Sequence, residues 1–311
     1  MTVYTVSGVV RYGQVILQAD TVKFESMSKL VLAPSEKNMA NPPNTLTIIA
    51  GEIIVADHAE ITYDLDGLQG LDPDTPAPAT MNTAPNGGDG GSSSGEGPYP
   101  QANNGGDGQP GKTGQKGVAG INAPELEIFV GKVSQSFPDA IFVDFKGQDG
   151  GRGGRGGNGG DGGTGQKGAA SQTSDSWYDG DQCDREPGKG GNGGKGGDAG
   201  FPGRGGRGGN GGIVKVFALK QTLPLVQTWK YVVNGGKGAP PGDPGAPGSG
   251  GAGGPQGDQN DPCPARDEYA GTGGPSGLSM DDADPNWGTD YKGSDGLDGD
   301  VGTNEISGLP S

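Results

Sequence analysis

The chain has 311 residues, of which 69 are glycine and 25 are proline, while hydrophobic residues make up only 29%. So small an apolar fraction excludes a single large core. The formal net charge of −16 argues against a nucleic-acid partner or an acidic membrane surface, because both attract clustered lysine and arginine. No apolar stretch is long enough to cross a bilayer, so we expect no membrane insertion.

The N-terminal segment, Met1 to Gly8, lacks the basic and apolar regions of a secretory signal peptide. No signal peptide is therefore visible. Three explanations stay open: a fragment of a longer protein, a non-classical secretion route, or assembly inside a cell.

Four pairs of apolar, β-branched segments follow along the chain. Within each pair the second segment begins 15 or 16 residues after the first. This spacing predicts four rungs of a small parallel β-solenoid, each made of two strands joined by an arch. Four independent hairpins are the alternative. The pairs are 15–19 with 30–33, 46–50 with 61–64, 126–130 with 141–145, and 214–218 with 230–233.

Long glycine-rich excursions separate the later rungs. Glycine recurs at every third residue in series that begin at Gly105, Gly147, Gly188 and Gly242, and the second and third of these series read Gly-Gly-X. A period of three matches a polyproline II or polyglycine II helix, which has no internal hydrogen bonds. We therefore expect an all-β/irregular fold, in which the solenoid carries inserted helices of this type packed as a bundle.

The side chains at the X positions should then point to solvent, among them Arg152, Arg155, Asn158, Asp161 and Asn192. Two other structures share the period of three. A collagen-like helix suits 234–257 best, because prolines gather there, and disorder is the second alternative.

Composition divides the chain into two expected domains. Residues 1–65 would form the N-terminal rungs of the solenoid. Residues 66–311 would form the glycine-rich bundle, with two further rungs at 125–145 and 213–233 interleaved.

The turning points of the excursions contain most of the remaining aromatic residues. We expect these turns at the far end of the bundle, near 92–104, 171–187, 258–270 and 279–292. Large rigid rings are common in recognition loops, although such rings could instead cap the bundle. The candidate ligand-binding residues are Tyr99, Trp177, Tyr178, Tyr269, Trp287 and Tyr291.

Both cysteines also fall in these turns. A disulfide between Cys183 and Cys263 is predicted and would favour an oxidising, extracellular setting, whereas two free thiols are the alternative. Nearby acidic residues could hold calcium through oxygen ligands, although they lack EF-hand spacing. These candidate ligands are Asp179, Asp181, Asp184 and Glu186. We expect no other cofactor.

The residues of common catalytic sites are missing from the pattern. The chain contains one histidine, His58, so no Ser-His-Asp, Cys-His or zinc set can be assembled. The glycine runs do not connect a strand to a helix, as nucleotide-binding loops do. We therefore expect that the protein is not an enzyme.

The Gly-Gly-X series broken by aromatic loops, as in 150–161, resembles polyglycine II bundle proteins. These include the tip adhesins of phage long tail fibres and related bacterial glycine-rich surface proteins. The resemblance covers roughly 87–302 and implies a sandwich of glycine helices whose far loops contact a host receptor. Glycine-rich insect antifreeze proteins share the helix type, but an ice-binding face needs small uncharged side chains, and these faces carry arginine, lysine and aspartate.

The ends of the predicted solenoid suggest self-association. After Val233 no segment is expected to return and cover the last rung, while Val3–Val10 is apolar and strand-like. Contact between these two ends would assemble copies head-to-tail. We expect a non-enzymatic structural protein outside the cell or on a cell or virion surface. It would be a subunit of a fibre or appendage whose tips bind a surface glycan or protein receptor. A discrete receptor-binding tip adhesin is the alternative.

Overall fold

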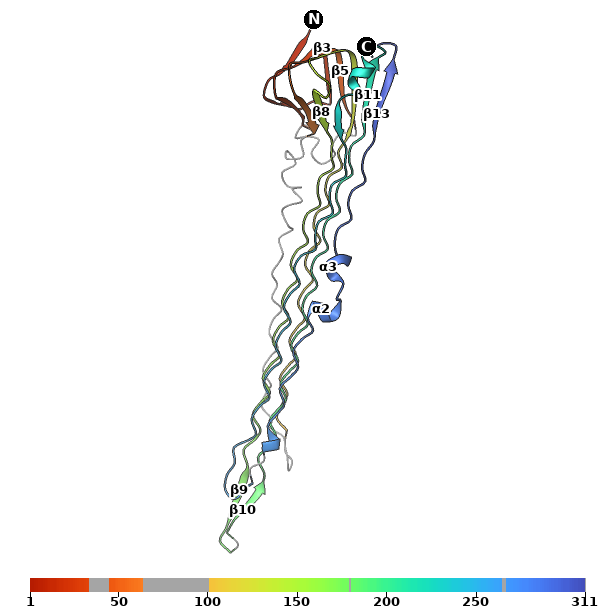
Figure 1. Cartoon of the computed structure of the whole chain (residues 1–311). Helices are drawn as coiled ribbons and strands as arrows, with labels where there is room; N and C mark the ends of the chain where they lie inside the picture. Colours follow the sequence, from red (N-terminus) through yellow and green to blue (C-terminus); the bar gives the residue numbers. More distant parts are fainter. Residues whose placement is uncertain (34–44, 64–100, 179, 265–266, 311) are drawn as a thin grey trace.

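A computed structural model describes residues 1–33, 45–63, 101–178, 180–264 and 267–310. The chain is mostly β and irregular, with little helix. It forms an elongated rod with two β-sheets at one end and long glycine-rich segments that run to the other (Figure 1). Both termini lie at the sheet end.

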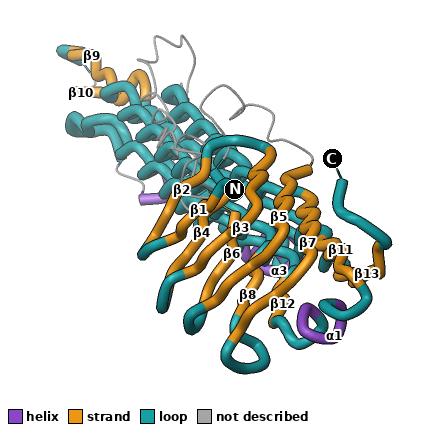
Figure 2. Tube along the Cα trace, turned by 90° about the horizontal axis from the view of Figure 1, so that it is seen from above, coloured by secondary structure: helices purple, strands orange, loops and turns teal. Residues whose placement is uncertain are grey.

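Strands alternate between two parallel sheets as the chain proceeds, so the sheets face each other in a solenoid-like stack (Figure 2). The first sheet contains, in spatial order, β1 (Val3–Val6), β3 (Ile16–Phe24), β5 (Thr45–Val55), β7 (Glu125–Gln135), β11 (Val214–Leu219) and β13 (Val301–Ile306). The second contains β2 (Val9–Tyr12), β4 (Ser28–Leu32), β6 (Ala59–Tyr63), β8 (Ile141–Asp144) and β12 (Lys230–Val232).

The core lies between the two sheets and follows the alternation of the strands. Buried and less buried residues alternate along β5 and β7, as expected when one face of a strand is covered. Ile48, Ile128 and Val216 are in register on successive strands and are almost fully buried. Stacked β-branched side chains therefore fill the space between the sheets.

The four predicted strand pairs correspond to β3/β4, β5/β6, β7/β8 and β11/β12. The stack is larger than expected, because the N-terminal strands add a further rung. In this rung β1 pairs with β3 in the first sheet and β2 pairs with β4 in the second. The expectation that no segment returns after Val233 was wrong, since β13 pairs in parallel with β11. With Gly302, Asn304 and Glu305, β13 has no apolar run to reveal it.

A short helix, α1 (Leu223–Val226), lies in the connection between β11 and β12. Its Val226 is fully buried. Thr222 before the helix donates a side-chain hydrogen bond to the Gly131 carbonyl, 2.7 Å away. The helix is thereby held against the end of the core.

The glycine-rich segments, here called arms, continue the two sheets as two layers. Arm 1 (102–123), arm 3 (188–212) and arm 5 (271–278 and 293–299) lead into β7, β11 and β13, whereas arm 2 (145–171) and arm 4 (234–258) leave β8 and β12. Hydrogen bonds between arms 1 and 3, such as Gly120 N to Arg207 O, pass directly into the β7–β11 ladder.

Neighbouring arms are joined by a backbone hydrogen bond at every third residue. In arm 2 two adjacent glycines donate in different directions, Gly156 to Asp243 O of arm 4 and Gly157 to Lys112 O of arm 1. A Cβ atom added to Gly156 would lie 2.2 Å from the Gly200 carbonyl oxygen of arm 3. Arms 2 and 3 each contact several neighbours, which explains why they carry two glycine columns.

Several X side chains lie at the surface, as predicted, and also bond to a neighbouring arm. Asn158 Oδ1 accepts from the Ala246 N–H at 3.0 Å, Asp161 Oδ1 accepts from Ser249 N–H at 2.8 Å, and Asn192 Oδ1 accepts from Thr272 N–H at 3.0 Å. A short Asx side chain can reach a backbone N–H of the adjacent arm. Arg152 likewise binds Asp243 at 2.7 Å, while Arg155 is exposed.

Arm 5 is interrupted on one side of the rod by α2 (Met280–Ala283) and α3 (Trp287–Asp290). Arm 4 has Gly235, Gly238, Gly250 and Gly253 where arm 5 packs against it. Between these glycines the same column contains proline, at 241, 244 and 247. The prolines that favoured a collagen-like helix thus mark the interval in which the neighbouring arm is missing.

Candidate functional site

A β-hairpin forms the end of the rod that lies farthest from the sheets (Figure 1). Its strands, β9 (Gln172–Ser176) and β10 (Gly180–Arg185), are antiparallel, and Gly180 pairs with Ser176. Gly180 has a φ of 74°, a left-handed conformation that glycine adopts readily in hairpin turns. The tight turn places Trp177 and Tyr178 at the extremity.

Trp177 and Tyr178 are uncovered. Trp177 is 88% exposed and Tyr178 is 82% exposed. Their ring centroids are 4.7 Å apart with an interplanar angle of 62°, an edge-to-face arrangement. Together they form an exposed aromatic contact surface, called the aromatic pair below.

The foot of the hairpin is fixed to the end of arm 4. A disulfide joins Cys183 of β10 to Cys263, whose side chain is almost fully buried. Asn260 adds two hydrogen bonds to Ser171, from its backbone N–H to Oγ at 2.6 Å and from Nδ2 to the carbonyl at 3.0 Å. The aromatic pair is therefore presented from an anchored base.

Carboxylates gather along one face of the hairpin. Asp181 lies directly opposite Asp175 in the register. A hydrogen bond with the Asp175 carboxyl raises the pKa of Asp181, and the charges of Asp175 and Asp261 raise this pKa further. The acidic groups are therefore close enough to repel one another.

The candidate calcium ligands are only partly described. Asp179 lies outside the described residues, and the Asp184 carboxylate accepts a hydrogen bond from Ser174 Oγ at 2.7 Å. Within the described ranges, no three histidine, cysteine, aspartate or glutamate side chains form a group that could hold a metal ion.

The other aromatic candidates have different surroundings. Tyr99 lies outside the described residues. Tyr269 is near the tip but is only 6% exposed. Its hydroxyl donates to Glu186 at 3.0 Å, and the Lys189 ammonium lies 5.2 Å from its ring centroid. Tyr269 therefore packs at the end of the bundle, which fits the capping interpretation of the tip aromatics.

Trp287 and Tyr291 do not lie at the tip, and the expectation that 279–292 is a far turn was wrong. Both belong to the interruption of arm 5 on the side of the rod (Figure 1). Trp287 Nε1 donates to Asp281 at 2.9 Å, and the Arg204 guanidinium lies 4.8 Å from the centroid of the Tyr291 ring. The arm does not turn here but resumes toward the sheets, since Gly208 N–H donates to Ser294 O.

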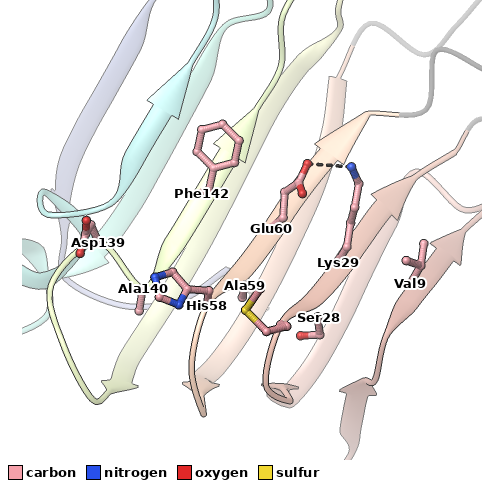
Figure 3. A pocket seen from close by; sticks show the side chains of 10 residues that line it. Val9, Ser28, Lys29, His58, Ala59, Glu60, Asp139, Ala140 and Phe142 are labelled. Carbon is pink, nitrogen blue, oxygen red and sulfur yellow. Dashed lines mark hydrogen bonds and ion pairs between the residues drawn. The ribbon is translucent and has the colours of Figure 1, made fainter.

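A groove on the outer face of the second sheet was missed by the sequence analysis (Figure 3). It encloses about 540 Å³, and the Lys29–Glu60 ion pair of 2.7 Å crosses it. Lys29, Glu60 and Phe142 are in register on β4, β6 and β8. The sequence could have indicated this groove only through the position of these three residues on the outward faces of their strands. The lining residues are Val9, Met27, Ser28, Lys29, His58, Ala59, Glu60, Asp139, Ala140 and Phe142.

No known family model matches the chain, and no curated protein matches it. Among solved structures, one similar chain is the nine polyproline type II helical bundle springtail antifreeze protein from Granisotoma rainieri. The identity is 24% and the TM-score is 0.07, over 56% of this chain and 94% of that chain. A likeness at this TM-score supports no conclusion about function.

In the part of the chain that the structure describes, no helix has the length and apolar character needed to span a membrane.

Proposed function

We propose that this protein is a non-enzymatic, extracellular structural protein that carries an adhesive hairpin at the end of a rod. In this proposal the arms are polyglycine II helices. The period of three in glycine and in the hydrogen bonds between arms supports that assignment. The rod would hold the hairpin at a fixed distance from the sheets.

The exposure of the aromatic pair carries the proposal. If the tip aromatics served only to cap the bundle, their rings should be covered, as the ring of Tyr269 is. Trp177 and Tyr178 are instead almost fully exposed at the extremity. Exposed rings of this kind supply much of the binding energy in protein interfaces. The partner would be a glycan or protein receptor on a cell surface.

The disulfide at the foot of the hairpin supports an extracellular site of action. Disulfides such as Cys183–Cys263 persist mainly in oxidising compartments. A cell or virion surface is the location that we propose.

Substitution of the aromatic pair tests this function. Trp177→Ala with Tyr178→Ala should lower the binding of fluorescently labelled protein to a panel of cell surfaces by about tenfold or more. Trp287→Ala, a tryptophan on the side of the rod, is the matched control and should bind as the parent does. Unchanged circular dichroism and melting temperature would show that the fold is intact. Full binding by the double variant would refute the proposal.

Head-to-tail assembly is a second candidate function, and the open ends of the sheets favour it. Among the described strands of the two parallel sheets, β1, β2, β12 and β13 each pair with a single neighbour. Val3 of β1 is 58% exposed and Val9 of β2 is 69% exposed. Because all pairings in both sheets are parallel, β1 of a second copy could continue the first sheet beyond β13. β13 thus replaces β11 as the expected contact in the first sheet, whereas β12 of the rung that ends at Val233 is still the edge strand of the second sheet.

A further inference from the structure

We propose that the aromatic pair recognises a cationic group on its partner, such as the ammonium or guanidinium groups of a basic protein surface. This inference rests on the proposed function and adds the chemical class of the ligand. It follows from the aromatic surface and from the charge that surrounds it.

The rings themselves are suited to a cation. The face of an indole or phenol ring has a negative electrostatic potential, and a cation within about 6 Å of its centroid is attracted. With Trp177 and Tyr178 almost fully exposed, a ligand can approach the faces of these rings. Elsewhere in this chain the arrangement already occurs, since the Arg204 guanidinium lies over Tyr291.

The charge around the pair selects the sign of the ligand. Residues 172–186 contain five acidic residues and one basic residue. Asp175 is two residues before Trp177 in the chain and lies near the end of β9, which finishes at Ser176. Asp181 lies opposite Asp175. The carboxylates of this face would repel an anionic ligand. A neutral ligand would not offset their negative charge.

The carboxylates of this face also gain from a bound cation. Asp175 and Asp261 act on Asp181 strongly enough to raise its pKa, so the ionised groups repel one another in the free protein. A positive group beside them would offset that repulsion. Arg185, the basic residue of the hairpin, is at the foot near the disulfide and leaves the tip itself acidic.

Two peptides that differ only in charge test the inference on the full chain. The probes are hexalysine and the same peptide with every Nε acetylated, since acetylation removes the charge. Binding would be measured by calorimetry at about 0.02 M and 0.15 M salt. Hexalysine should bind at least about tenfold more tightly at low salt. Trp177→Ala should weaken hexalysine binding about fivefold or more.

The variant Asp175→Asn/Asp181→Asn should remove most of the difference between the two peptides. Asp290→Asn/Asp300→Asn, which removes two acidic groups far from the tip, is the matched control and should keep the difference. Equal binding of both peptides, or hexalysine binding that the control weakens as much as the tip variant, would overturn the inference. If a cell surface is bound through Trp177 while the acetylated peptide binds as well as hexalysine, the proposed function stands and the cationic ligand does not.

Discussion

At inner-arm glycines such as Gly156, a neighbouring backbone occupies the place that a Cβ atom would take. In Gly156→Ala the new Cβ would lie 2.2 Å from the Gly200 carbonyl oxygen, whereas in Gly273→Ala the nearest atom is Gly251 O at 3.6 Å. We predict that Gly156→Ala lowers the free energy of unfolding by about 3 kcal/mol and that Gly273→Ala changes it little. Chemical denaturation of both variants is the measurement. Equal stability losses would contradict the close packing of the arms.

The pKa of Asp181 provides a second test at the scale of single residues. Since the hydrogen bond with Asp175 and the nearby negative charges raise this pKa in the folded state, the folded hairpin holds its proton more tightly than the unfolded chain. Stability from this group is therefore present at low pH and declines as pH rises from the unfolded pKa through the folded pKa. A titration followed by NMR should show a raised pKa for Asp181 that falls in Asp175→Asn. An unshifted titration would show that the two carboxyls do not interact.

Between arms, Asx side chains supply hydrogen bonds in addition to those of the backbone. Removing the Asn158 acceptor leaves the Ala246 N–H without its partner at 3.0 Å. We predict that Asn158→Ala costs about 1 kcal/mol of stability and that Asn158→Asp, which keeps the oxygen acceptor, costs clearly less. Denaturation midpoints would measure both changes. If the two variants lose the same stability, the side chain does not act through this hydrogen bond.

Much of the strand arrangement could be predicted because its signal is local. Ile48 and Ile128 belong to runs of alternating β-branched residues that need only one covered face. β13 gave no such signal, since its pairing with β11 depends on arm 5 bringing the chain back. A strand of mixed polarity at an edge is defined by its neighbour more than by its own sequence.

The candidate site was predictable only in part. Trp177 lies in the turn between two polar strands, β9 and β10, and the far turn expected within 171–187 is at the tip of the rod (Figure 1). Trp287 lies in a similar polar break, and periodicity alone cannot distinguish a break in an arm from its turning point. Two prolines distinguish the break in arm 5 from a turning point. Pro202 of arm 3 and Pro241 of arm 4 stand at positions where glycine would allow arm 5 to pack.

For the whole molecule, the open strand edges predict concentration-dependent assembly. Lysine at an edge strand opposes pairing with another copy, so Val3→Lys should prevent filaments that the parent chain forms at high concentration. Tyr178→Lys, at the opposite end of the rod, should not affect them. Electron microscopy across a dilution series would measure assembly. Single particles of the parent chain at every concentration would rule out the head-to-tail arrangement.

The arms form one hydrogen-bonded body that continues the sheets, and both the rod and its tip depend on it. Amide hydrogen exchange, followed by NMR with labelled glycine, tests this directly. The N–H groups of Gly157 and Gly200, each bonded to a neighbouring arm at 2.7 and 2.9 Å, should exchange orders of magnitude more slowly than an unstructured chain. Exchange of these amides at the rate of a free chain would show that the arms are not a bundle, and the tip would then have no rod to hold it.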